Sequence, residues 1–385
     1  MANKHSTLTS LFTDIADSIR EVTDTTGTYV ADTFPNDIIN LGKPIATQWT
    51  SKSDSLIAPT LTTVSPGAII EIKAVTYYNG YWYGVGNDIT GDAYKLYGAS
   101  TSALTAYKIG TNRNYPVTGI GCDGTYVWIC CSSGSYSNRV LLVQPIENFQ
   151  SSSTALSVWT SETHMFNDMA SIPGVAIMAF GGYISGAGAA MYRGTPNKTA
   201  SISSYASYVP ETLVSGCAYK STFIAVTPGG YIVQWHDPTN AGIYHKKLAC
   251  LNGAQKCCQM GDYLCVACVR YNSSTSAYET YLSYTSSNYP TNGDWCSFKI
   301  ADANLTIVGM AYANGLYTLI AKNGTDGTIT TVWQTTDLKD HGVYGQTMAL
   351  SNGFIARAVA ANGKYICVLA DNLNGSVQKA LATIT

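Results

Sequence analysis

The chain has 385 residues, enough for two or three average domains or for one large all-β unit. Only 12% of the residues are charged and the net charge is −2, so neither nucleic acid nor an anionic membrane is an expected partner. The N-terminus lacks a signal layout and no apolar run is long enough to cross a bilayer, so we expect a protein made in a cytoplasm and not inserted in a membrane.

Residues 7–23 carry apolar side chains at steps of three and four, which predicts an amphipathic helix with acidic residues on its other face. A second short helix is predicted near 33–41, with Thr33 as N-cap and Pro35 in the first turn. Two helices within 42 residues cannot bury a core of their own. The apolar stripe must therefore pack on the rest of the chain, on its own copies or on a partner. Its members are Leu8, Leu11, Phe12, Ile15, Ile19 and Val22.

From about residue 70 the sequence repeats one pattern. An apolar strand meets a tight turn, often Asn-Gly or Asp-Gly, and a second strand, a polar loop, a third strand and a fourth strand follow. The repeated turns are marked by Gly80, Gly124, Gly174, Ser221, Gly261, Gly315 and Gly363, at spacings of 40 to 54 residues. Four antiparallel strands at this period are typical of β-propeller blades. The sequence therefore predicts an all-β, seven-bladed β-propeller over residues 43–385, preceded by a helical segment over 1–42.

The last repeat has room for only three strands before the chain ends. The segment 45–65, between the predicted helices and the first repeat, can supply the missing outer strand. Such a closure joins both ends of the chain and removes an open sheet edge that would invite aggregation.

The segment 256–268, KCCQMGDYLCVAC, contains a Cys-x-x-Cys pair, Cys265 and Cys268, beside Cys257 and Cys258. Side chains alternate between the two faces of a strand, so the members of each pair point to opposite sides of the sheet and cannot share a zinc ion. We expect reduced core thiols and no metal site. The five histidines are dispersed without metal-ligand spacing, and nothing in the sequence predicts a cofactor.

The segment 284–298, YTSSNYPTNGDWCSF, resembles the Asp-box turn between the third and fourth strands of sialidase-like propellers, and 332–342 resembles it more weakly. A sialidase implies three arginines around the substrate carboxylate, a Tyr–Glu pair and an acidic Asp. This chain has six arginines in dissimilar contexts, and one of them, Arg20, lies in the N-terminal segment. The resemblance thus favours the architecture and not the activity. A glycosidase using some other pair of carboxylates stays open, although the sequence selects no such pair.

Residues 8–41 resemble a short N-terminal module of bacteriophage tail and fibre proteins, in which an Ile-Ala-Asp-(Ala/Ser)-Ile-Arg helix precedes a Thr-Gly-Thr turn and a Phe-Pro-x-x-Ile segment. The chain lacks the lysines that often follow that turn. The matching residues are Ile15, Ala16, Asp17, Ser18, Ile19, Arg20, Thr26, Gly27, Thr28, Phe34, Pro35 and Ile38.

The resemblance implies a virion protein of a tail fibre, baseplate or head fibre, assembled in the host cytoplasm as a homo-oligomer. Residues 1–42 would bind other virion proteins, and the propeller would bind a host-surface glycan or protein without being an enzyme. Two alternatives are a purely structural or decoration protein of the virion and a glycan-cleaving enzyme.

The receptor surface is expected on the face that carries the loops between second and third strands and the connections between blades. These segments offer aromatic rings and planar polar groups, a combination that suits sugars. The candidates on the loops are Asn87, Tyr136, Tyr183, Tyr271 and Asp326, and those on the connections are Arg113, Tyr115, His164 and Tyr208. The tight turns of the opposite face are expected to leave little side-chain variety.

Overall fold

The structure is a computed structural model. It describes residues 58–64, 70–99, 104–109, 115–132, 141–159, 164–183, 188–195, 200–204, 208–235, 243–323, 329–340, 344–347, 354–372 and 377–383. The predicted helices, and with them all six residues of the apolar stripe, lie outside the described residues.

Within the described residues, seven four-stranded antiparallel sheets follow one another, and we number them as blades in chain order. Blade 1 comprises β2 (Ile70–Tyr78), β3 (Tyr81–Asp88), β4 (Ala93–Ala99) and β5 (Thr105–Lys108). Blade 2 comprises β6 (Val117–Cys122), β7 (Tyr126–Cys131), β8 (Leu141–Pro145) and β9 (Ser157–Trp159), with the one-turn helix α4 (Ile146–Phe149) after β8. Blade 3 comprises β10 (His164–Ile172), β11 (Ala176–Tyr183), β12 (Ala189–Gly194) and β13 (Ala200–Ser204).

Blade 4 comprises β14 (Ser215–Tyr219), β15 (Thr222–Val226), β16 (Gly229–Trp235) and β17 (Tyr244–Asn252). Blade 5 comprises β18 (Ala254–Met260), β19 (Tyr263–Asn272), β20 (Ala277–Thr285) and β21 (Cys296–Ala301). Blade 6 comprises β22 (Thr306–Ala313), β23 (Leu316–Asn323), β24 (Ile329–Thr335) and β25 (Tyr344–Thr347), with the 3-10 turn η1 (Leu338–Asp340) before β25. Blade 7 comprises β26 (Ile355–Ala361), β27 (Tyr365–Asp371), β28 (Val377–Thr383) and β1 (Ala58–Val64).

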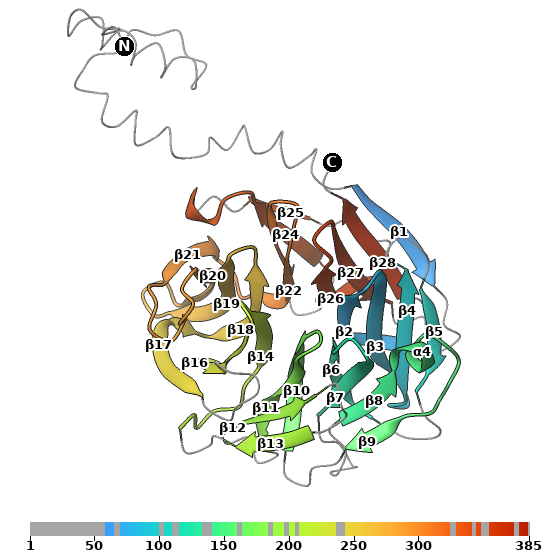
Figure 1. Ribbon diagram of the computed structural model, residues 1–385. Coiled ribbons are helices and arrows are strands. Elements are labelled where there is room, and N and C mark those ends of the chain that lie inside the picture. The colour runs from blue at the N-terminus through green and yellow to red at the C-terminus, as the bar shows by residue number, and fades with distance from the viewer. Residues whose placement is uncertain are drawn as a thin grey trace, which may run out of the picture.

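The first strand of each blade lies innermost, and the blades form a closed ring (Figure 1). Each innermost strand contacts the innermost strands of both neighbouring blades, and the circuit closes where β26 contacts β2. The predicted architecture, a propeller of four-stranded blades, is confirmed. The number of sheets equals the number of turn markers in the sequence.

The turns inside the blades follow the chemistry that the sequence indicates. Asn79 and Gly80, like Asn314 and Gly315, both have positive φ, as a two-residue hairpin turn of type I′ requires. In blade 4 the same turn is made without glycine, because Lys220 and Ser221 adopt φ values of 44° and 66°.

Strand β1 is the outer strand of blade 7, and it lies within the segment 45–65 that the sequence analysis assigns to this place. It pairs antiparallel with β28 over seven residues, from Ala58 opposite Thr383 to Val64 opposite Val377. The last blade is thus built from both ends of the chain.

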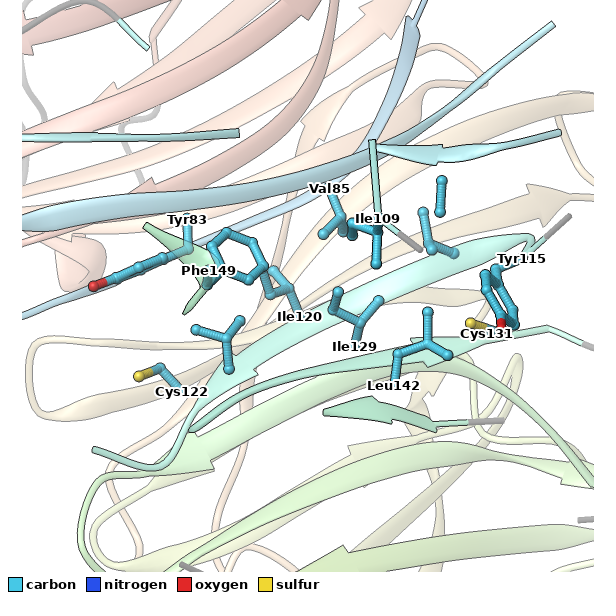
Figure 2. Close-up of a cluster of buried hydrophobic side chains, with 13 residues drawn as sticks. Tyr83, Val85, Ile109, Tyr115, Ile120, Cys122, Ile129, Cys131, Leu142 and Phe149 are labelled. Atoms are coloured by element: carbon cyan, nitrogen blue, oxygen red, sulfur yellow. The ribbon is translucent and has the colours of Figure 1, made fainter. Parts of the chain in front are cut away.

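The core lies between blades, so the second strand of a blade is buried on both faces. Strand β3, for example, is buried from Trp82 to Asn87. Figure 2 shows the cluster between blades 1 and 2, where Tyr83 packs edge-on against Phe149 of α4 with ring centroids 5.6 Å apart. Burial on both faces explains why these strands read as nearly continuous apolar runs rather than as alternating ones.

Polar groups near one face of the ring form hydrogen bonds between neighbouring blades. The hydroxyl of Thr118 donates to the carbonyl of Phe166 at 2.6 Å, and the amide of Asn167 donates to the carbonyl of Leu213 at 3.0 Å. At the closure, the backbone N–H of Ile72 in blade 1 donates to the carboxylate of Asp371 in blade 7 at 2.8 Å. These bonds satisfy backbone groups at the starts of the inner strands, which would otherwise be buried without partners.

Candidate functional site

The ring has two different faces. The loops between second and third strands share one face with the connections between blades, which we call the loop face. The tight turns between first and second strands lie on the other, which we call the turn face. Asn87, at the end of β3, shows the first relation directly, because its side chain bonds to the connection that leads into β6.

Three predicted receptor residues are corrected by their burial: Asn87, Tyr115 and His164. Asn87 is 8% exposed, and its amide donates to the carbonyl oxygens of Gly91 and Tyr115 and accepts from the N–H of Val117. Tyr115 is 2% exposed and belongs to the core between blades 1 and 2. The side chains of Asn87 and Tyr115 hold a connection in place, so neither can contact a receptor on the surface. Tyr115, where the described part of this connection begins, points into the core rather than out to solvent.

His164 and Tyr183 lie together on blade 3, with ring centroids 4.7 Å apart. His164 is buried, and this burial lowers the pKa of its imidazole. Tyr208 is 60% exposed and contacts the ring of His245 at 5.6 Å. The remaining candidates, Arg113, Tyr136 and Asp326, lie outside the described residues.

Among the predicted candidates, Tyr271 is the one that forms an exposed aromatic pair beside a depression in the surface. It is the last residue but one of β19 and lies directly opposite Tyr278 of β20. The two rings meet at 66° with centroids 5.3 Å apart, and the residues are 57% and 47% exposed. Exposed aromatic pairs of this kind offer a large contact area at a small cost in conformational entropy.

A depression of about 450 Å³ lies beside this pair on the loop face. Tyr278 lines it together with mostly apolar residues from blades 4, 5 and 6 and from the three connections that precede these blades. The lining residues are Val214, Pro228, Gly253, Ala254, Gln255, Val269, Tyr278, Asn304 and Ile307. Its size lies in the range of small-molecule sites.

A polar network on the opposite face of the same sheet holds the β19–β20 hairpin. The Tyr281 hydroxyl donates to Glu279 at 2.7 Å, the Asn272 amide donates to it at 3.2 Å, and Lys299 pairs with it at 3.2 Å. These hydrogen bonds, led by that of Tyr281, lower the pKa of Glu279. The guanidinium of Arg270 lies 4.3 Å from the centre of the Tyr281 ring. These interactions therefore hold the hairpin of Tyr271 in place from the opposite face of the sheet.

The turn face carries a hollow that the sequence analysis missed. It measures about 430 Å³ and lies between the first turn of blade 1 and helix α4 of blade 2. Its lining is Tyr78, Asn79, Tyr81, Tyr83, Gly124, Thr125, Ile146, Glu147 and Gln150. The expectation of little side-chain variety on this face is wrong here, because Glu147 of α4 and Gln150 directly after it bring a carboxylate and an amide beside three tyrosines. The tyrosine-rich run YYNGYWY at 77–83 is the sequence feature that could have indicated this hollow.

The central channel is the largest of the three hollows, at about 590 Å³. It is lined by the inner strands, and six of these carry a register shift that leaves one residue unpaired with the second strand: Lys73, Thr118, Asn167, Gln255, Val308 and Arg357. Such bulges redirect side chains. Four of the six, Lys73, Thr118, Val308 and Arg357, line the channel, as do Asp168, Lys256 and Lys322.

The cysteines lie as the strand argument predicts. Cys265 packs in the core between blades 5 and 6, whereas Cys268 packs in the core between blades 4 and 5. Cys258 and Cys257 are divided between the same two clusters. Burial raises the pKa of Cys130 to about 12 and that of Cys268 to about 11, which keeps them as thiols. Among the described residues, no group of three or more potential ligands could hold a metal ion.

Both Asp-box-like segments occupy the expected place, between the third and fourth strands of blades 5 and 6. In the first, the indole of Trp295 donates to the carbonyl of Pro290 at 2.8 Å. The described arginines of the ring, Arg193, Arg270 and Arg357, lie on three different blades, and of these only Arg357 lines the channel. No helix within the described ranges is long and apolar enough to span a membrane.

No protein-family model and no curated protein matches the chain. Similar solved structures include a chain of the Mitotic Checkpoint Complex (10% identity, 86% of this chain and 93% of that chain, TM-score 0.58). Others are the WD40 β-propeller domain of Doa1 (9% identity, 85% and 96%, TM-score 0.54) and the Cps50 (Swd1) β-propeller domain of Myceliophteria thermophila (11% identity, 85% and 100%, TM-score 0.56). The chain has a β-propeller fold. At this level of identity, the likeness shows the fold alone.

Proposed function

We propose that this chain is a structural protein of a bacteriophage virion, in a tail fibre, baseplate or head fibre, and that its propeller binds a host-surface glycan. The observation that carries the binding role is the exposed Tyr271–Tyr278 pair beside the depression on the loop face. Support for the virion comes from the sequence resemblance of residues 8–41. Those residues would attach the protein to other virion proteins, with several copies in the particle.

The depression suits a sugar on chemical grounds. A pyranose presents C–H groups on its faces and hydroxyls at its edge, so it stacks on an aromatic wall and needs planar polar groups beside it. Tyr278 supplies the wall, and the exposed Asn304 supplies an amide at its margin. Because the polar network behind the sheet fixes the hairpin, little conformational entropy is lost when a ligand binds.

Binding without cleavage is favoured by the state of the acid behind this hairpin. A glycosidase needs a carboxylic acid whose pKa is raised so that it can protonate the leaving oxygen. The pKa of Glu279 is instead lowered, because the carboxylate accepts hydrogen bonds from Tyr281, Asn272 and Lys299. Glu279 therefore stays ionised and serves the fold of the hairpin.

The test is to replace Tyr271 and Tyr278 together by alanine in the full chain. Binding of the purified protein to host cells should fall by at least about tenfold, because the aromatic wall is lost. The melting temperature should change little, since both rings are about half exposed. Flow cytometry with labelled protein measures the binding, and phage adsorption with the same variant checks it on the particle.

The matched control is Tyr81→Ala, which removes a partly exposed tyrosine from the hollow of the turn face. We expect this variant to bind like the unmodified protein. Loss of binding in the control with none in the double variant would place the receptor site on the turn face. Undiminished binding in both variants would favour a purely structural virion protein.

A further inference from the structure

The loop-face mouth of the channel gathers more positive than negative charge where blades 6, 7 and 1 meet. Lys73, Lys322 and Arg357 line the channel there. The only carboxylates in their described charge network are Glu71 and Asp371. Lys73 pairs with Glu71 at 2.8 Å, and Arg357 pairs with Asp371 at 3.1 Å and reaches Glu71 at 3.7 Å. Both carboxylates are thus already engaged.

Lys322 is the third cation of this group, and neither of the two carboxylates forms an ion pair with it within the described residues. It stands near the end of β23, opposite Thr306, and within the described residues its ammonium makes neither an ion pair nor a hydrogen bond. Its partial burial, together with the positive charge of Arg357, lowers its pKa to about 8, although Asp371 and Glu71 partly offset this effect. At neutral pH the group is mostly charged and incompletely compensated, which is a costly arrangement for a partly buried amine.

The acid–base pair on the far wall of the channel does not remove this excess. Asp168 accepts a hydrogen bond from Ser215 at 2.7 Å and lies 3.8 Å from the ammonium of Lys256. The opposite charges of Asp168 on blade 3 and Lys256 on blade 5 therefore cancel each other. The channel beside Lys322 is also lined by small residues of the inner strands, Ala74, Gly309 and Ala358.

We propose that Lys322, Lys73 and Arg357 form a binding site for a phosphate-type oxyanion at the loop-face mouth of the channel. A dianion with several oxygens can accept hydrogen bonds from three cations that stand on different strands, which a single carboxylate does less well. The site does not depend on the proposed glycan binding, since it uses other residues. It fits a free phosphate as well as a phosphorylated surface polymer.

The experiment titrates sulfate into the full chain by isothermal calorimetry, because sulfate keeps its double charge across the pH range used. Lys322→Ala should weaken sulfate binding by about tenfold or more, since one charged hydrogen-bonding partner is lost. Lys322→Arg should bind within a few-fold of the unmodified protein. Lys364→Ala is the control, because Lys364 is an exposed lysine on the turn face and should have no effect.

The pH profile identifies the group. Binding to the unmodified protein should weaken as the pH rises from about 7 to about 9, because Lys322 loses its proton in this window. The Lys322→Arg variant should lose that dependence, since arginine stays charged. Equal sulfate affinity in Lys322→Ala and the unmodified protein, with both folded by circular dichroism, would overturn the proposal. Acetate binding as tight as that of sulfate would also overturn it, in favour of a carboxylate site.

Discussion

Lys95 is a buried amine that joins two blades. It stands in β4, and its ammonium donates to Gln144 Oε1 at 3.1 Å and to the carbonyls of Asn148 and Ser153 at 2.7 and 2.9 Å. Phe149 contributes its ring face at 5.4 Å. Burial lowers the pKa of Lys95 to about 8, because no carboxylate faces it within the described residues. The hydrogen bonds hold the segment after α4 against blade 1.

Replacement of Lys95 by methionine should destabilise the protein by about 2 kcal/mol, because the buried Oε1 of Gln144 loses its donor and the carbonyls of Asn148 and Ser153 each lose one of two donors. Urea unfolding measures the change. Lys247→Met is the control, since Lys247 is an exposed lysine on β17 whose ammonium lies over the ring of Tyr231 at 5.4 Å, and this variant should stay within about 0.5 kcal/mol of the unmodified protein. A smaller loss in Lys95→Met than in the control would mean that water replaces the amine.

At the scale of the single strand, β1 has a different role from the segment before it. It covers β28, whose backbone would otherwise form an open sheet edge. The resemblance to phage proteins assigns attachment to residues 1–42. Two truncations can therefore separate closure of the ring from attachment to the virion.

A chain that starts at residue 43 keeps β1, so it should fold with an unchanged melting temperature and fail to enter virions. A chain that starts at residue 65 lacks β1 and should aggregate, because β28 offers its unpaired edge to other copies. Scanning calorimetry and size-exclusion chromatography measure the fold, and immunoblots of purified particles measure incorporation. Normal incorporation of the first truncation would show that residues 1–42 are not the attachment element.

The secondary-structure elements could be predicted from the sequence more fully than the candidate site could. Asn-Gly turns and apolar runs are local signals, so they predicted the hairpins, the order of strands within a blade and the segment that holds β1. The burial of Tyr115 was not predictable in this way, because it depends on Asn87 of the preceding blade. Likewise, Lys322 and Arg357 meet only through the packing of neighbouring blades, and the bulge at Arg357 does not show in the alternation of its strand.

At the scale of the whole molecule, the thiols act as small apolar side chains. Of the eleven cysteines, all of which are free in the structure, only Cys296 is exposed. Chelator and reducing agent should therefore leave the melting temperature unchanged within about 1 °C, because all eleven cysteines are free and the described residues hold no group of three potential metal ligands. Differential scanning fluorimetry with and without each reagent checks this. A fall of several degrees with the chelator alone would point to a metal ion bound between copies or by residues beyond the described ranges.

The pairing of β1 with β28 also has a mechanical consequence. Ala58 lies opposite Thr383 at the turn face, and β1 runs from there to the loop face, antiparallel to β28. In a particle that holds the protein by residues 1–42, tension enters at the turn face and a receptor on the loop face resists it. The load then runs along the strand, across hydrogen bonds that lie perpendicular to it. All the bonds of the pair are strained together in shear, whereas a pull away from the sheet would peel them apart one at a time.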